Sequence, residues 1–134
     1  MLRQITELES IGDSCYNLAR TLNRHRQNCT EQFTELQLSN MHNMLDMVCK
    51  AMQHMGNVVE AILSGNHVDY NTSYNLENEI NNYRRQLKNR NLQDVDNKLY
   101  SYQLGVFYID FISECEKLGD YILNVVQATK AEKV

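Results

Sequence analysis

The sequence contains no proline and no tryptophan, and only five of its 134 residues are glycine. Proline and glycine interrupt regular secondary structure and mark turns, so their scarcity indicates long helices joined by a few short connections. The same composition argues against collagen-like, disordered and many-stranded β architectures. A chain of this length is typical of one domain with a buried core. We therefore predict a single all-α domain over residues 1–134.

An excess of positive charge and a long apolar run are also missing. The net charge is −4 at pH 7, so the chain has no overall positive field to hold nucleic acid. No uninterrupted apolar segment approaches the roughly 20 residues that a bilayer-spanning helix needs. The four cysteines include no Cys-x-x-Cys pair, which predicts reduced thiols in the core instead of a disulfide framework or a zinc site.

Helical periodicity covers nearly the whole chain and predicts four helices, over residues 2–28, 30–64, 70–89 and 94–130. In the first of them we expect one apolar stripe to face the core, formed by Leu8, Ile11, Cys15, Leu18 and Leu22. Asparagine-rich turns separate the last three helices, and short connections favour antiparallel neighbours. The predicted fold is therefore an up-down-up-down four-helix bundle.

The expected helix ends follow from turn and cap residues. Gly65-Asn66-His67 should end the second helix, and Asp69 or Asn71 should cap the third. Asn89-Arg90-Asn91 should end the third helix, and Asp94 should cap the fourth. The first helical pattern runs from the opening residues without a visible cap. We therefore expect the sequence to be part of a longer protein, with a frayed natural N-terminus as the alternative interpretation.

One polar pattern occurs twice, in segments that lie 107 positions apart (5 and 112, for example). The first copy spans residues 5–13 and is followed by Asn17, and the second spans residues 112–120 and is followed by Asn124. Ile, Glu, Glu, Gly, Asp and Asn recur at the same offsets. Packing alone requires only the apolar positions, so the recurrence of polar residues and of a helix-weakening glycine points to a function.

The spacing within each copy puts two carboxylates on one face of a helix, Glu9 with Asp13 and Glu116 with Asp120. Because the first and last helices are expected to be antiparallel, both motifs should lie at the same height along the bundle. Four converging carboxylates repel one another, and a bound cation reverses that effect. We therefore predict these four as ligands of a divalent or trivalent cation such as iron, zinc, manganese or magnesium. Glu7 and Glu114 fall on a different face and are not assigned to the site.

The setting E-x-[IL]-G-D-x-x-x-N around these carboxylates resembles the PhoU family, which regulates bacterial phosphate uptake and homeostasis. The family carries this motif in repeated three-helix units and is implicated in binding iron or zinc clusters. A single unit is most similar to the PhoU-like domain of bacterial sodium-dependent phosphate cotransporters. The histidine that usually follows the motif aspartate is replaced here by Ser14 and Tyr121.

This resemblance implies a non-catalytic regulatory domain at the cytoplasmic face of the cell membrane. Its implied partners are the attached transmembrane transporter region or other phosphate-transport components, with a homodimer as a further possibility. No enzyme motif such as HExxH, GxSxG or a phosphate-binding loop occurs, and no glutamate has a histidine three residues later. The alternative interpretation is a metal-free helical scaffold or dimerisation module whose acidic faces are solvated.

Overall fold

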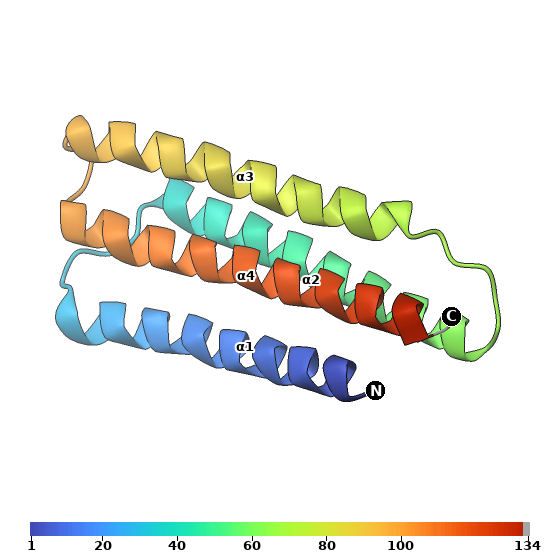
Figure 1. Cartoon of the computed structure of the whole chain (residues 1–134). Helices are drawn as coiled ribbons and strands as arrows, with labels where there is room; N and C mark the ends of the chain where they lie inside the picture. The colour runs from blue at the N-terminus through green and yellow to red at the C-terminus, as the bar shows by residue number, and fades with distance from the viewer. Residues whose placement is uncertain (133–134) are drawn as a thin grey trace.

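Four helices and their connections make up the structure, a computed structural model that describes residues 1–132 (Figure 1). The helices are α1 (Leu2–Asn28), α2 (Glu35–Leu63), α3 (Asn71–Asp96) and α4 (Tyr102–Glu132). No strand is present in residues 1–132, so the predicted all-α class is confirmed. Within the same residues, no helix combines the length and the hydropathy that crossing a membrane requires.

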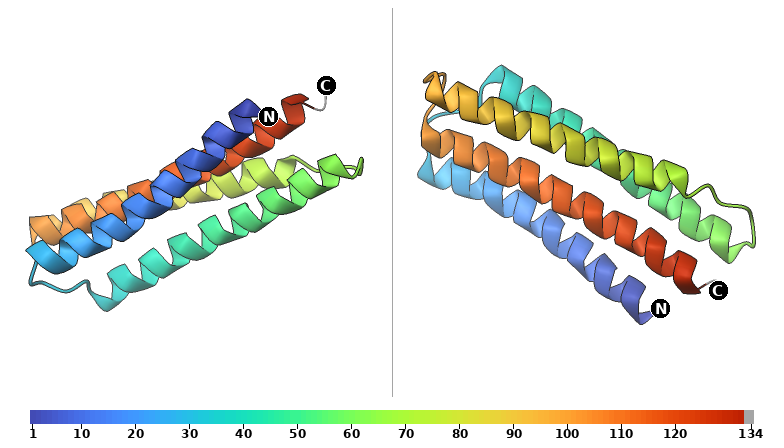
Figure 2. Two further views of the ribbon diagram at one scale, coloured as in Figure 1. Left: turned by 90° about the horizontal axis from the view of Figure 1, so that it is seen from below. Right: turned by 45° about the horizontal axis from the view of Figure 1, so that its top comes forward.

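The helix α4 lies at the centre of the arrangement and packs against the other three helices. The helices α2 and α3 also pack against each other, whereas in the described part of the chain α1 packs against α4 alone. Figure 1 shows both termini and the α2–α3 connection at one end, and the other two connections at the opposite end. The two views in Figure 2 show α1 following α4 along its length. The molecule is therefore a group of three helices with a fourth laid along one of them.

The core reflects this unequal packing. Fully buried side chains come mainly from α2 and α4, as in Met44, Val48, Phe111, Ile112 and Cys115. Thirteen residues of α4 are buried, but only three residues of α1 are. Of the five apolar residues expected to form the inner stripe of the first helix, only Ile11 and Leu18 are buried. The other three are exposed because α1 has a single helix to pack against.

The predicted bounds of the first helix are confirmed, but the second helix begins later than predicted. Thr34 forms a capping box with Gln37: the Thr34 hydroxyl accepts from the Gln37 backbone N–H at 3.0 Å, and the Gln37 side-chain oxygen accepts from the Thr34 N–H at 2.9 Å. This cap fixes the start of α2 at Glu35 and leaves residues 30–34 as a connection. Neither predicted cap of the third helix occupies the N-cap position, which is taken by Tyr70 without a side-chain cap hydrogen bond. Asp69 lies one residue earlier and accepts from the Asn71 N–H at 2.9 Å.

The predicted break between the third and fourth helices is wrong. Residues 89–91 continue α3, and Asp94 lies inside that helix, where it pairs with Arg90 at 3.3 Å. The Asn91 side chain is buried and accepts a hydrogen bond of 2.6 Å from the Tyr100 hydroxyl. This tertiary contact holds asparagine in a helix despite its preference for turns. The chain turns instead at Lys98, in the left-handed region with φ of 59°.

Candidate functional site

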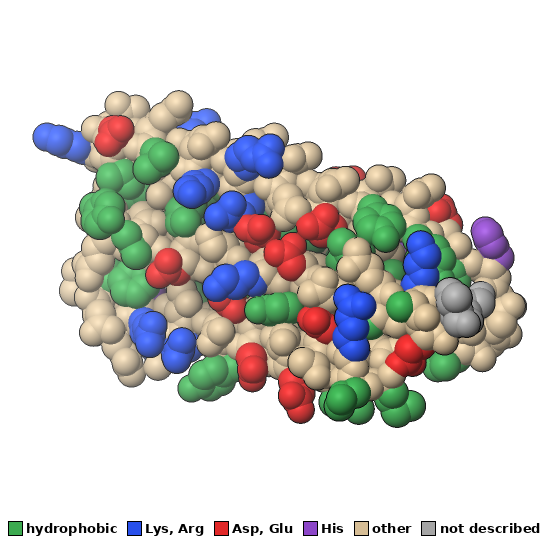
Figure 3. Space-filling view, viewed as in Figure 1, with side chains coloured by type: hydrophobic (Ala, Val, Ile, Leu, Met, Phe, Trp, Pro, Cys, Tyr) green, Lys and Arg blue, Asp and Glu red, His purple; other side chains and the backbone are tan. Residues whose placement is uncertain are grey.

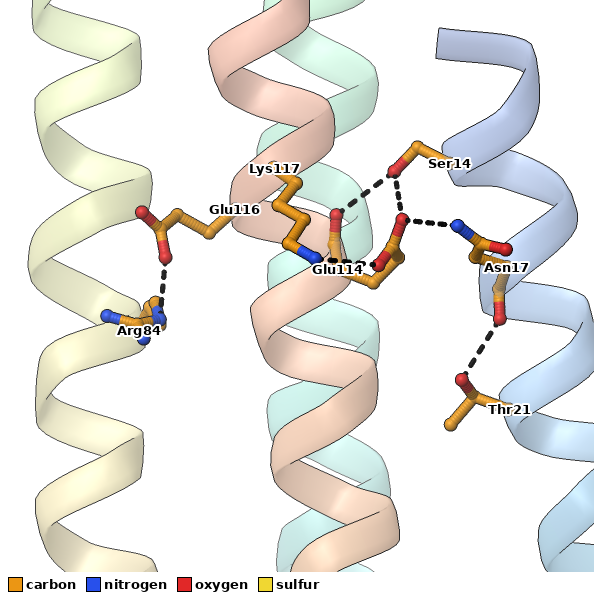
Figure 4. Close-up of polar contacts among 7 residues, drawn as sticks. All are labelled: Ser14, Asn17, Thr21, Arg84, Glu114, Glu116 and Lys117. Atoms are coloured by element: carbon orange, nitrogen blue, oxygen red, sulfur yellow. Dashed lines mark hydrogen bonds and ion pairs between the residues drawn. The ribbon is translucent and has the colours of Figure 1, made fainter. Parts of the chain in front are cut away.

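The first glutamate and the asparagine of each copy of the repeat join α1 to α4. Glu114 on α4 accepts hydrogen bonds from the Asn17 amide at 3.2 Å and from the Ser14 hydroxyl at 2.8 Å (Figure 4). Glu7 on α1 accepts a hydrogen bond from the Asn124 amide at 3.2 Å. Glu7 and Glu114 occupy the same position of the repeat, as do Asn17 and Asn124.

The two contacts are therefore reciprocal, and they fix an antiparallel register between α1 and α4. The glutamate of each copy accepts from the asparagine of the other, as two halves related by a local two-fold axis do. The sequence alone does not assign Glu7 and Glu114 to the site, although these two residues bring the two copies together. Glu7 can reach α4 because it lies four residues before Ile11, on the buried side of α1.

The other carboxylate pair of each copy lies elsewhere. Glu9 and Asp13 are exposed on α1. Glu116 points from α4 toward α3, where its Oε2 atom lies 2.6 Å from Nε of Arg84. Figure 4 shows Glu116 and Glu114 on opposite sides of α4, one directed to α3 and the other to α1.

Asp120 lies one turn beyond Glu116 and belongs to the same acidic group between α3 and α4. Burial, a hydrogen bond with Glu77 and the charge of Glu116 together raise the pKa of Asp120 to about 6, against the lowering effect of Arg84. Glu77 in turn accepts a hydrogen bond of 2.6 Å from the Asn81 amide. Figure 3 shows acidic side chains gathered near the middle of this face, with basic side chains beside them.

The structure does not bring the four predicted metal ligands together. On a helix, the two glutamates of each copy point about 200° apart, so the one that faces the partner helix excludes the other from that contact. The interface uses Glu7 and Glu114, which directs Glu9 and Asp13 to solvent and Glu116 and Asp120 to α3. Among residues 1–132 no group of three or more His, Cys, Asp and Glu side chains is placed to hold a metal ion. The side chains as they lie do not fit one shared metal site between the first and last helices.

The cysteines are free thiols in different surroundings. Cys115 is fully buried, and burial raises the pKa of its thiol to about 12, so it stays protonated at neutral pH. Cys15 and Cys49 are exposed, so the expectation that all four thiols lie in the core is wrong for these two. Cys15 belongs to the side of α1 that no helix in the described residues covers.

Comparison with protein-family models, curated proteins and solved structures gave no match to this chain. The resemblance to the PhoU family therefore depends on the repeated sequence motif alone.

Proposed function

We propose that this chain is a non-catalytic, PhoU-like regulatory domain of phosphate uptake, acting as the cytoplasmic-face domain of a sodium-dependent phosphate cotransporter. In this proposal the functional domain is an up-down-up-down four-helix bundle. The observation that supports it is the pair of motif copies on the first and last helices, joined by reciprocal glutamate–asparagine hydrogen bonds. A repeated polar motif that positions two helices is a feature beyond what helix packing requires.

A route for regulation follows from the position of α4. Glu114 faces α1 and Glu116 faces α3, so one turn of α4 carries both contacts (Figure 4). Gain or loss of charge near Glu116 and Asp120, by protonation or by cation binding, alters the contacts of the turn of α4 that also carries Glu114 and its contact with α1. We expect such a change to shift α1 relative to the other three helices and so to reach an attached transporter region.

Cation binding by the acidic residues remains a prediction, and in this proposal it concerns Glu116 and Asp120. Glu116 and Asp120 share one surface, but Glu116 is paired with Arg84, so a cation that binds there has to displace the guanidinium group. We expect Arg84→Gln to strengthen cation-dependent thermal stabilisation by iron, zinc, manganese or magnesium. Glu116→Gln combined with Asp120→Asn should abolish it. If no variant is stabilised by any of these cations, the cation part of the proposal is wrong.

Phosphate uptake by cells that carry the gene in its own context tests the regulatory role. We expect Glu116→Gln/Asp120→Asn to remove the dependence of uptake on external phosphate while the protein level stays unchanged. The matched control is Glu9→Gln/Asp13→Asn, which alters the same positions of the exposed copy and should leave uptake as in the parent. Equal regulation in the parent and in both variants would contradict the proposal. The coding sequence upstream of Met1 gives a second check, because the proposal expects membrane-spanning segments there.

The second candidate is a metal-free helical scaffold or dimerisation module. The exposure of Glu9 and Asp13 supports it, because acidic residues on an uncovered helix face are solvated without any ligand. This candidate predicts normal phosphate regulation in every variant above and no stabilisation by cations.

A further inference from the structure

An apolar stripe on the outside of α1 is left uncovered. Its residues follow one another at steps of three and four, which places them on one face of the helix. We call this face the α1 stripe, and it consists of Ile5, Leu8, Gly12, Cys15, Ala19 and Leu22. All six are exposed, and the accessible fractions of Ile5, Leu8 and Leu22 are 47%, 48% and 41%. Figure 3 shows hydrophobic side chains standing out along the edge of the molecule that α1 forms.

The repeat shows what kind of face this is. The positions of α4 that correspond to the α1 stripe are all buried where α2 and α3 pack, namely Ile112, Cys115, Gly119, Ile122, Val126 and Thr129. Ile80 of α3 packs so closely on Gly119 that an added Cβ atom would lie 3.2 Å from its Cδ1 atom. An added Cβ atom on Gly12 would meet nothing within 4 Å among the described residues. The α1 stripe therefore has the composition of a helix-packing face, but in the part of the chain that the structure describes no helix packs against it.

The charges of α1 indicate which partner fits this face. The exposed charges of the first half are Glu9 and Asp13 with one arginine, Arg3, so this half is acidic on balance. The exposed charges of the second half are all basic, namely Arg20, Arg24 and Arg26. In an antiparallel pair of α1 helices, the acidic half of one copy lies beside the basic half of the other. A parallel pair would place like charges together. Gly12 and Cys15 stand at the middle of the stripe, where small side chains let two helices approach closely.

We propose that two copies of this chain form a symmetric dimer in which their α1 stripes pack antiparallel. Such a contact is isologous, because each copy offers the same surface to the other. The proposal does not depend on the regulatory function proposed above. Failure of either one therefore leaves the other standing.

Sedimentation equilibrium of the full chain, from the micromolar to the millimolar range, tests the proposal. We expect the parent to dimerise as its concentration rises, and Leu8→Lys to weaken dimerisation at least about tenfold because it buries a charge in the contact. The matched control is Leu38→Lys, at an apolar position of α2 with 45% exposure, which should dimerise as the parent does. Circular dichroism checks that both variants remain helical.

Thiol alkylation and charge reversal give two further readouts. Alkylation of Cys15 should slow as the protein concentration rises, whereas alkylation of Cys49, exposed on α2, should not. Glu9→Arg should weaken the dimer, and Arg20→Glu in the same chain should restore it, since the pairing is antiparallel. A parent that stays monomeric over the whole range overturns the proposal. A dimer that Leu8→Lys leaves unchanged, or one that protects Cys49 instead of Cys15, also overturns it.

Discussion

The copy of the repeat in α4 is covered by α2 and α3 as well as by α1, whereas within residues 1–132 the copy in α1 is covered by α4 alone. The first glutamate and the asparagine have the same role in both copies, because the glutamate of each copy accepts a hydrogen bond from the asparagine of the other. The second glutamate and the aspartate have different surroundings. In α4 they face Arg84 and Glu77, and in α1 they are exposed.

This difference shows that a repeated motif does not by itself define one shared site. Residues that point at the symmetry partner keep equivalent roles, since the same contact is made twice. Residues that point away from the symmetry partner take their role from the helix beside them. In the described residues α3 lies beside the copy in α4, and no helix lies in the equivalent place beside the copy in α1. The acidic pair on α4 is therefore held in place by α3, and its counterpart on α1 remains free to meet something outside the described residues.

The largest expected difference between the copies is at the two glycines. Gly119→Leu forces a side chain against Ile80 and should lower the free energy of unfolding by about 2–3 kcal/mol. A Cβ atom added at Gly12 meets nothing within 4 Å among the described residues, so Gly12→Leu should raise the free energy of unfolding by up to about 1 kcal/mol, because leucine favours helix over glycine. Urea denaturation of both variants measures the difference. Equal effects at the two positions would mean that α3 does not pack on α4 as described.

A smaller effect is expected from breaking the reciprocal contacts. A double-mutant cycle with Glu114→Ala and Asn17→Ala should give a coupling free energy of about 1–2 kcal/mol, since Glu114 is a charged and largely buried acceptor. The equivalent cycle with Glu7→Ala and Asn124→Ala should give about 0.5–1 kcal/mol, because among residues 1–132 Glu7 accepts one side-chain hydrogen bond from the partner helix, whereas Glu114 accepts two. Zero coupling in both cycles would contradict the role of these residues in joining α1 to α4.

The fold class and the bounds of the first helix can be predicted from the sequence. The absence of proline and the helical periodicity predict the all-α class, and the bounds of α1 follow from the same pattern. The end of α3 cannot be predicted in this way. Local propensity places a break at Asn91, but the Tyr100 hydroxyl, nine positions later, donates a hydrogen bond to the Asn91 side chain and holds this residue in the helix. Turn residues predict a break only where no tertiary contact satisfies their side chains.

The repeat can be recognised in the sequence, but the sequence does not show which glutamate of each copy faces the partner helix. The repeat identifies Glu9, Asp13, Glu116 and Asp120 as residues worth attention. Which glutamate of each copy faces the partner helix depends on how far each helix is rotated about its axis. Apolar residues on two sides of the helix leave that rotation open. The structure settles it, since Ile11, Ser14 and Leu18 define the buried side of α1 and leave Glu9 outside it.

A difference of similar size to that of the second cycle is expected from the pH dependence that Asp120 contributes. The pKa of Asp120 is about 6 in the folded protein and 3.8 in an unperturbed carboxyl group, so the folded state binds the proton more tightly than the unfolded state does. Stability should therefore fall as pH rises from about 4 to about 6, and the part of this fall that belongs to Asp120 should disappear in Asp120→Asn. We expect that part to be about 1 kcal/mol, less than the full shift implies, because the side chain is partly open to solvent.

Asp13→Asn is the matched control, since it changes the same position of the exposed copy. Urea denaturation at pH values between 4 and 7 measures both variants. A parent whose stability is flat over this range would contradict the placement of Asp120 beside Glu77 and Glu116, because burial next to two carboxylates has to make ionisation costly. An equal change in both variants would mean that the two copies are not distinguished by α3 at all.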